Sequence, residues 1–120
     1  MANTIEHLAD RKCVPCQGGQ PPLTRERALQ FLTQVPGWQL QDNAKQIART
    51  YVMKNFVVAV NFIDKVAAIA EKEGHHPDIH LTGYRNLTIE LSTHKIGGLS
   101  ESDFILAAKI NLLPAELKTS

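Results

Sequence analysis

The stretch that decides the fold is residues 55–74, NFVVAVNFIDKVAAIAEKEG. Asn55 is a favoured N-cap residue and Gly74 a favoured residue at a helix C-terminus, so together they predict a long helix over residues 56–73. Two apolar stripes run along this helix at helical spacing. The first stripe is Phe56, Val60, Ile63, Ala67 and Ala70, and the second is Val58, Phe62, Val66 and Ile69.

A helix that covers one face of a sheet needs only one apolar stripe, so two stripes leave two explanations. Either the domain wraps this helix on both sides, or the second stripe packs against a partner subunit. We expect the latter, which predicts a homo-oligomer, a dimer or tetramer, joined through this helix.

The flanking segments predict the remaining elements. Thr24 can cap a first helix, which Pro36-Gly37 ends. Residues 38–40 and 47–52 are typical of two strands around the polar turn 41–44, and a short strand surrounds Leu81. Residues 87–93 alternate apolar and polar side chains, and Ser100 to Asp103 begin a last helix that runs to about Leu113. The order helix, strand, strand, helix, strand, strand, helix indicates an α+β fold, an antiparallel sheet with helices on one face.

Composition limits the classes of function. The chain has 120 residues, which is one domain, with 13 basic and 12 acidic side chains. No basic excess is present to neutralise phosphates, so nucleic-acid binding is disfavoured. The longest purely apolar runs, such as residues 56–60, are too short to cross a membrane, and no signal-peptide pattern opens the sequence, so we expect a cytoplasmic protein.

Residues 1–22 differ from the rest, because Gly and Pro punctuate them after the Cys13-x-x-Cys16 pair. We interpret them as an N-terminal arm ahead of a single domain over residues 23–120. In a reducing cytosol a structural disulfide is disfavoured. The pair can be half of a zinc knuckle, but no second CxxC completes the site, and a thioredoxin-like role lacks a βαβ unit.

The densest group of ionisable side chains follows the long helix, in residues 71–80, EKEGHHPDIH. Gly74 lets the chain leave the helix and Pro77 prevents its continuation, so His75 and His76 project from a fixed corner. Glu71 precedes His75 by one helical turn, and its carboxylate can therefore orient an imidazole.

Two further residues complete the candidate site. His94 shares the parity of Thr88 and Glu90 in the alternating segment, so we expect it on the polar face of the sheet. Asp103 follows in the first turn of the last helix, where its charge suits the helix dipole. Because histidine titrates near pH 7, two imidazoles from different elements can act as acid and base across one substrate.

Plainer interpretations stay open. A single exposed histidine is usually a solvated surface residue, Trp38 can be a core anchor, and Asp103 can be only a helix-start residue.

A non-enzymatic interaction module that uses the second stripe is one rival function, and a metal-dependent hydrolase is another. Its ligands would come from His75, His76, His80 and His94 with Glu71 or Asp78. We expect no metal site, because no HExxH occurs and Pro77 breaks the register between His76 and His80.

A longer pattern joins these residues: Glu71-x3-His75-His76-Pro77, then six residues to Tyr84, nine to His94 and eight to Asp103. With GWQL at 37–40, EGHHPDIH at 73–80 and STHKIGGLSESDF at 92–104, it resembles the pterin-4a-carbinolamine dehydratases, also called 4a-hydroxytetrahydrobiopterin dehydratases. The resemblance covers roughly residues 23–113. The segment between Pro77 and His94 is one residue longer than in animal members, so we expect the hairpin over residues 81–86 to differ.

The resemblance implies a four-stranded antiparallel sheet with three helices on one face, in oligomers that are commonly tetramers. It implies loss of water from a 4a-hydroxytetrahydropterin to give a quinonoid dihydropterin, which a reductase returns to the tetrahydro form. It implies no metal and no organic cofactor.

The resemblance also implies residue roles. His75 and His94 match the acid/base histidines, and His76 matches a third histidine of the catalytic set that helps to hold the pterin. The stretches His75-His76-Pro77 and Thr93-His94-Lys95-Ile96 match the pterin-contacting segments. Glu71, Trp38 and Asp103 match supporting positions around the site.

Overall fold

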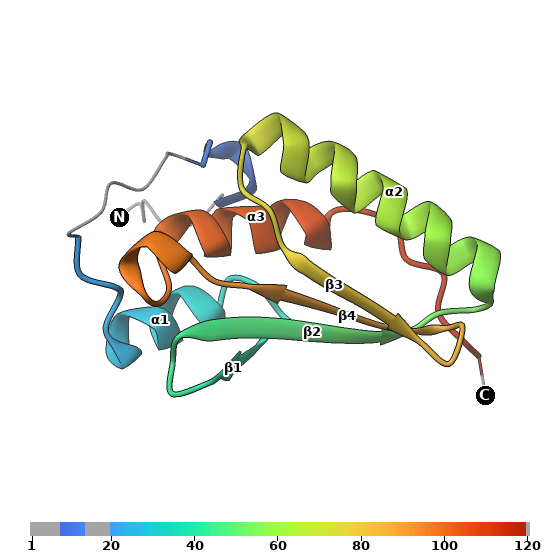
Figure 1. The fold of residues 1–120 in the computed structure, drawn as a ribbon, viewed down its shortest axis with the longest axis horizontal. Helices are drawn as coiled ribbons and strands as arrows, with labels where there is room; N and C mark the ends of the chain where they lie inside the picture. Colours follow the sequence, from blue (N-terminus) through green and yellow to red (C-terminus); the bar gives the residue numbers. More distant parts are fainter. Residues whose placement is uncertain (1–7, 14–19, 120) are drawn as a thin grey trace.

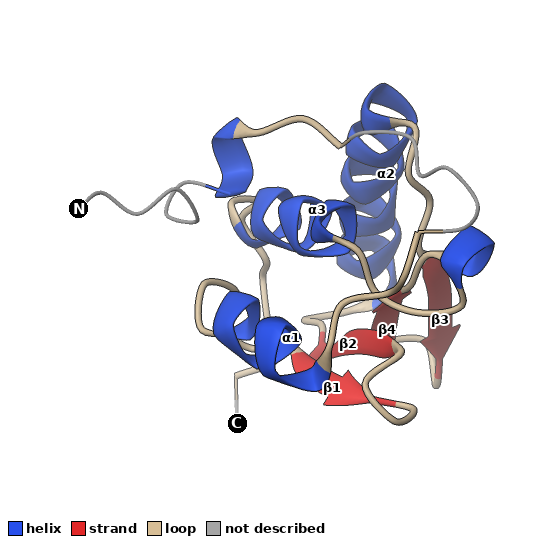
Figure 2. Ribbon diagram, turned by 90° about the vertical axis from the view of Figure 1, so that its left-hand side faces the viewer, coloured by secondary structure: helices blue, strands red, loops and turns tan. Residues whose placement is uncertain are grey.

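A computed structural model describes residues 8–13 and 20–119 and confirms the α+β fold, a four-stranded antiparallel sheet with three helices packed on one face (Figures 1 and 2). The elements are α1 (Arg25–Leu32), β1 (Gln39–Gln41), β2 (Gln46–Val52), α2 (Phe56–Glu73), β3 (Asp78–Thr82), β4 (Asn86–Leu91) and α3 (Glu101–Asn111). Two short 3-10 helices, η1 (Leu8–Asp10) and η2 (His94–Ile96), lie before α1 and between β4 and α3.

The sheet has the strand order β1-β2-β4-β3, with every neighbouring pair antiparallel. Its register places Ile47 opposite Leu91 and Ile79 opposite Ile89, so apolar side chains share the face that the helices cover. Thr50, Thr88 and His80 lie on the other face, which none of the described helices covers (Figure 2).

Helix α2 has the predicted bounds and caps. The Asn55 side chain accepts a hydrogen bond from the Val58 N–H at 2.9 Å. At the other end Gly74 is left-handed, with φ 67°, and the N–H groups of Gly74 and His75 donate to the carbonyls of Glu71 and Ala70. This is a Schellman motif, which satisfies the last carbonyls of the helix and sets the direction in which His75 leaves it.

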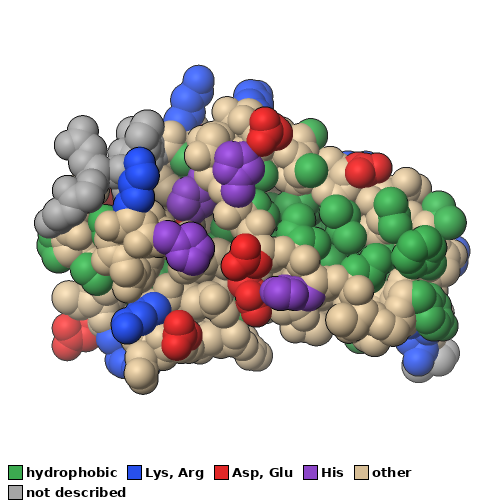
Figure 3. Space-filling model, viewed as in Figure 1, with side chains coloured by type: hydrophobic (Ala, Val, Ile, Leu, Met, Phe, Trp, Pro, Cys, Tyr) green, Lys and Arg blue, Asp and Glu red, His purple; other side chains and the backbone are tan. Residues whose placement is uncertain are grey.

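The stripes of α2 are used differently from the expectation, because the second packs on the core and the first is exposed at its start and buried at its end, at Ala70. Phe62 and Val66 of the second stripe are buried against the core, so the expectation that this stripe meets a partner is wrong. Phe56 of the first stripe is 52% exposed, and its neighbour Val57 is 65% exposed. Figure 3 shows apolar side chains spread over α2 and the adjoining sheet edge. Sequence periodicity alone does not say which of two stripes the sheet covers.

Strand β4 ends at Leu91, two residues earlier than predicted. The chain then turns, because the Thr93 N–H donates to the Gly98 carbonyl at 2.8 Å across a short bridge. His94 therefore lies in η2 rather than on the strand, and the parity argument does not apply to it. Its side chain is exposed all the same.

Helix α3 is the most deeply buried of the three α-helices. Its buried side chains include Phe104, Ile105, Leu106 and Ile110. The rings of Phe104 and Phe31 stack with centroids 5.4 Å apart, which fixes α1 against α3. Within the described parts of the chain, every helix is too short or too polar to span a membrane.

We predict that Gly74→Ala lowers the free energy of unfolding by about 1–2 kcal/mol, because an L side chain is strained in the left-handed region. No atom lies within 4 Å of an added Cβ, so steric overlap adds nothing. Urea denaturation measures the change, and Gly74→Asn is the control, because Asn tolerates this backbone better. Equal losses for Ala and Asn would contradict this explanation.

Candidate active site

The centre of the site is the pair formed by His75 and Asp103. The His75 Nε2 lies 2.5 Å from the Asp103 Oδ1, and the Asp103 side chain is fully buried. The His75 side chain is 15% exposed, so part of the ring reaches the surface. A carboxylate partner holds the proton on Nε2, which leaves Nδ1 as the nitrogen that can accept or give a proton.

Asp103 also joins the loop that follows β4. Its Oδ2 accepts hydrogen bonds from the Thr93 hydroxyl at 2.8 Å and from the Ser100 N–H at 2.9 Å. The Thr93 hydroxyl lies 2.8 Å from the Ser100 hydroxyl as well. The interaction with Ser100 is a capping box at the start of α3. Asp103 is therefore a helix-start residue and the partner of His75 at once.

This network places His94 near the pair. His94 directly follows Thr93, and its exposed side chain lines an open depression of about 220 Å³. The other walls come from the β1–β2 turn, from Ser92 and Thr93, and from Gly97 and Gly98. In Figure 3 histidine side chains gather on one face of the molecule. Two segments that carry an imidazole are thus linked through one carboxylate.

Glu71 contacts His76 rather than His75. The His76 Nε2 lies 2.7 Å from the Glu71 Oε2, and both side chains are largely exposed. The reversal of the chain at Gly74 turns His75 toward α3 and leaves His76 beside the last turn of α2. An exposed pair of this kind contributes little stability, so its effect is mainly to orient the ring.

The other candidate residues lie outside the contact between His75 and Asp103. Lys95 and Ile96 belong to η2, exposed and half-buried respectively, and Pro77 is half-buried just before β3. His80 lies on the uncovered face of the sheet, where its Nε2 is 3.0 Å from the Glu90 Oε1. The position of His80 on the uncovered face separates it from the His75–Asp103 pair.

Trp38 is a buried anchor at the far end of α3. Its indole N–H donates to the Asn111 Oδ1 at 2.9 Å, and Asn111 is the last residue of the helix. Asp103 is eight residues earlier, about 12 Å along the axis at 1.5 Å per residue. The plainer interpretation of Trp38, a core anchor, describes these contacts.

The sequence predicted the capping box between Ser100 and Asp103, and the structure confirms it. Sequence reasoning missed the hydrogen bond from the Thr93 hydroxyl to Asp103, because nothing local pointed to it. Within residues 8–13 and 20–119, no group of three or more His, Cys, Asp or Glu side chains lies together in an arrangement that could hold a metal ion.

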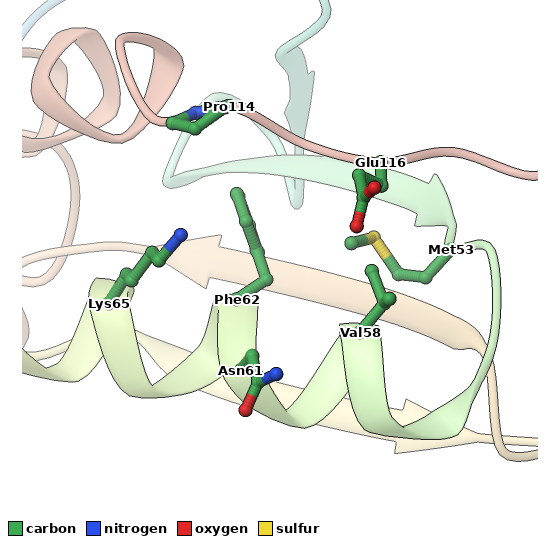
Figure 4. Close-up of a pocket in the computed structure, with 7 residues that line it drawn as sticks. All are labelled: Met53, Val58, Asn61, Phe62, Lys65, Pro114 and Glu116. Carbon is green, nitrogen blue, oxygen red and sulfur yellow. The ribbon is translucent and has the colours of Figure 1, made fainter.

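A larger cavity of about 340 Å³ lies at the opposite end of α2. Figure 4 shows Val58, Phe62 and Lys65 pointing from α2 toward the C-terminal segment that carries Pro114 and Glu116. Its lining has no histidine, and α2 spans about 27 Å over its 18 residues. The larger cavity is therefore separate from the candidate acid and base groups.

Comparison with known proteins decides the family. The model of the family described as "Pterin 4 alpha carbinolamine dehydratase" matches residues 21–113, which include every residue of the His75–Asp103 network. The chain belongs to this family. The matched range agrees closely with the extent of the resemblance, and it leaves out the described arm residues 8–13.

Curated relatives of this family match over most of the chain. A protein of Halorhodospira halophila, whose name as a pterin-4-alpha-carbinolamine dehydratase is marked as provisional, is 50% identical over 108 residues, 90% of this chain and 98% of its own length. The pterin-4-alpha-carbinolamine dehydratase 2, mitochondrial, of Arabidopsis thaliana is 45% identical over 116 residues, 94% of this chain and 62% of its own length.

Solved structures share the fold. A protein of Brucella melitensis titled a transcriptional coactivator/pterin dehydratase aligns with a TM-score of 0.69 and 33% identity, over 75% of this chain and 95% of its own. A pterin dehydratase-like protein titled a RuBisCO assembly factor in the alpha-carboxysome aligns with a TM-score of 0.53 and 22% identity, over 62% of this chain and 86% of its own. The second likeness concerns the fold alone.

We predict that Thr93→Val lowers the free energy of unfolding by about 1–3 kcal/mol, because valine keeps the shape of threonine but removes a hydrogen bond to the buried Asp103. Thermal or urea denaturation measures the loss. Thr93→Ser is the matched control, since it keeps the hydroxyl and should lose less than the valine variant. A valine variant as stable as the wild type would show that this hydroxyl does not support Asp103.

Proposed function

We propose that the chain is a 4a-hydroxytetrahydrobiopterin dehydratase, a hydro-lyase that acts in the recycling of tetrahydropterins. The substrate class comes from the family to which the chain belongs. The observation that carries the proposal for this chain is the 2.5 Å contact between His75 and a fully buried carboxylate, linked through Thr93 to the segment of His94. It supports a pair of imidazoles for acid/base chemistry.

The reaction needs only proton transfer. The N5 lone pair of the pterin expels the C4a hydroxyl, so the C4a–O bond breaks and a C4a=N5 double bond forms. One proton must reach the departing oxygen, which leaves as water, and N5 must lose one proton. Groups that titrate near neutrality can each contribute about 10²- to 10⁴-fold to such steps. In this proposal neither a metal nor an organic cofactor takes part.

The proposed roles are those that the family resemblance implies, and the contacts of the site support them. His75 and His94 are the acid and base, and Asp103 holds the ring of His75 with Nδ1 available for the proton. His76, which Glu71 orients, helps to hold the pterin. We propose that the pterin contacts His75-His76-Pro77 on one side and Thr93-His94-Lys95-Ile96 on the other. Trp38 then supports the site only through the packing of α3.

We predict that purified protein accelerates dehydration of 4a-hydroxytetrahydropterin that is generated in situ and followed by absorbance. His75→Ala and His94→Ala should each lower kcat by at least about tenfold, and the double variant should lose less than the product of the two. His80→Ala is the matched control, because His80 lies on the uncovered face of the sheet. A wild-type rate equal to the uncatalysed rate would overturn the proposed function.

We also propose that the chain is a homo-oligomer, a dimer or tetramer, joined through α2. The support is the exposed start of the helix, where Phe56 of the first stripe is 52% exposed and its neighbour Val57 is 65% exposed. Contiguous apolar surface of this kind is typical of subunit contacts.

We predict that light scattering gives a mass for the wild type that is a multiple of 13.3 kDa, and that Val57→Glu shifts it toward 13.3 kDa. A carboxylate buried in an apolar interface without a partner is strongly unfavourable. Leu112→Glu is the control, because Leu112 is also exposed and apolar but lies just after α3. A wild-type monomer, or an assembly that Val57→Glu leaves intact, would rule out this interface.

A further inference from the structure

Residues 8–13 of the N-terminal arm lie across α3 and reach the C-terminal end of α2, next to the corner that carries His75 (Figures 1 and 2). The Leu8 side chain is buried in the core, and the Lys109 Nζ of α3 donates to the Ala9 carbonyl at 2.8 Å. Arg11 pairs with Glu101, the first residue of α3, at 2.8 Å. Residues 8–13 lie outside the range that the family model matches.

Glu73, the last residue of α2, is where the arm, α2 and α3 meet. Its side chain is only 6% exposed. Its Oε1 accepts the Cys13 N–H at 2.9 Å, and its Oε2 lies 3.5 Å from the Lys109 Nζ. The Cys13 N–H, together with the nearby Lys109, holds the pKa of the Glu73 carboxyl below its ordinary value, so Glu73 is charged at neutral pH.

Besides the backbone contact to Glu73, Cys13 makes a side-chain contact to the start of α3. Its thiol donates to the Ser102 carbonyl at 3.4 Å. Burial and the nearby Glu73 raise the pKa of this thiol to about 11, so the thiol stays protonated and can donate. In the docked arm Cys13 is therefore a packed donor rather than a reactive thiolate.

The two attachment points of Cys13 flank the catalytic pair. Glu73 precedes His75 by two residues, and Ser102 directly precedes Asp103. The relative position of these two chain segments sets the contact between the His75 Nε2 and the Asp103 Oδ1. The link from Glu73 to Lys109 joins the same two helices about 9 Å farther along α3, six residues after Asp103.

We propose that the arm, residues 8–13, is a clamp on this site and that Glu73 is a positioning residue for His75. Docking of the arm holds the end of α2 against the start of α3, and so keeps the His75 ring on Asp103. The claim that the clamp aids catalysis rests on the proposed function. The claim that it positions the His75 ring is tested by measurements that need no turnover.

The experiment uses the full chain with Cys16→Ser, so that Cys13 is its single cysteine. Glu73→Ala removes both acceptor oxygens, Glu73→Gln keeps one acceptor, and Glu26→Ala is the matched control at an exposed carboxylate in the first turn of α1. Three measurements are made on each variant: alkylation of Cys13 by iodoacetamide, the ring NMR signals of His75, and kcat with KM.

The expected result is a graded change. Glu73→Ala should speed alkylation of Cys13 at least about tenfold, because the undocked thiol is exposed and its pKa falls toward the ordinary value. The His75 ring signals should shift, and kcat should fall about three- to tenfold with KM changed less than about twofold, because the position of the His75 ring changes while the other pterin contacts remain. Glu73→Gln should lie between Glu73→Ala and the control.

Leu8→Ala is the second variant, because it loosens the arm from the core without touching the carboxylate beside His75. It should reproduce the faster alkylation and the shifted His75 signals. Faster alkylation with unchanged His75 signals and unchanged kcat, in either variant, would show an arm that docks but positions nothing. Unchanged alkylation in Glu73→Ala would show that Glu73 does not hold the arm. If the wild type has no turnover, the proposed function fails while the alkylation and NMR results still decide the clamp.

Discussion

One buried carboxylate, that of Asp103, constrains the whole site. A carboxylate without exposure to water costs several kcal/mol unless donors surround it. Here the donors come from the corner after α2, from the loop after β4 and from the N-cap of α3. These three segments must therefore meet at one point, and the rest of the fold places them there: the antiparallel pair β3–β4 and the packing of α2 against α3 bring residues 75, 93 and 100 together.

The same constraint explains the shape of the connection between β4 and α3. Thr93 itself has extended backbone, with φ −117° and ψ 100°, and the chain turns after it, so that the carboxylate of the next helix reaches the Thr93 hydroxyl. The early end of the strand, the bridge between Thr93 and Gly98, and the turn of η2 return the chain over a short distance. His94 is presented at the surface as a result of this return, while Thr93 is buried beside it.

Local chemistry made most of the fold predictable from the sequence. Asn55, Gly74 and Ser100 act within one or two turns of chain, so their caps could be recognised, and the alternation of residues 87–91 needed no partner to be seen. Contacts between distant segments could not be inferred this way. The bond from His75 to Asp103 spans 28 residues, the choice between the stripes of α2 depends on where the sheet lies, and Glu71 met His76 because Gly74 reverses the chain.

The two carboxylate oxygens of Asp103 have different partners, which has a consequence for how this site could change during evolution. One oxygen holds the ring of His75, and the other caps α3 and accepts the Thr93 hydroxyl. Selection for a stable fold alone would therefore preserve this aspartate in a descendant that no longer catalysed anything. Conservation of Asp103 in a relative thus says little about turnover. In the proposed mechanism the exposed His94 side chain acts on the substrate, and among the described residues it caps no helix, so a change at His94 would be the better marker of lost turnover.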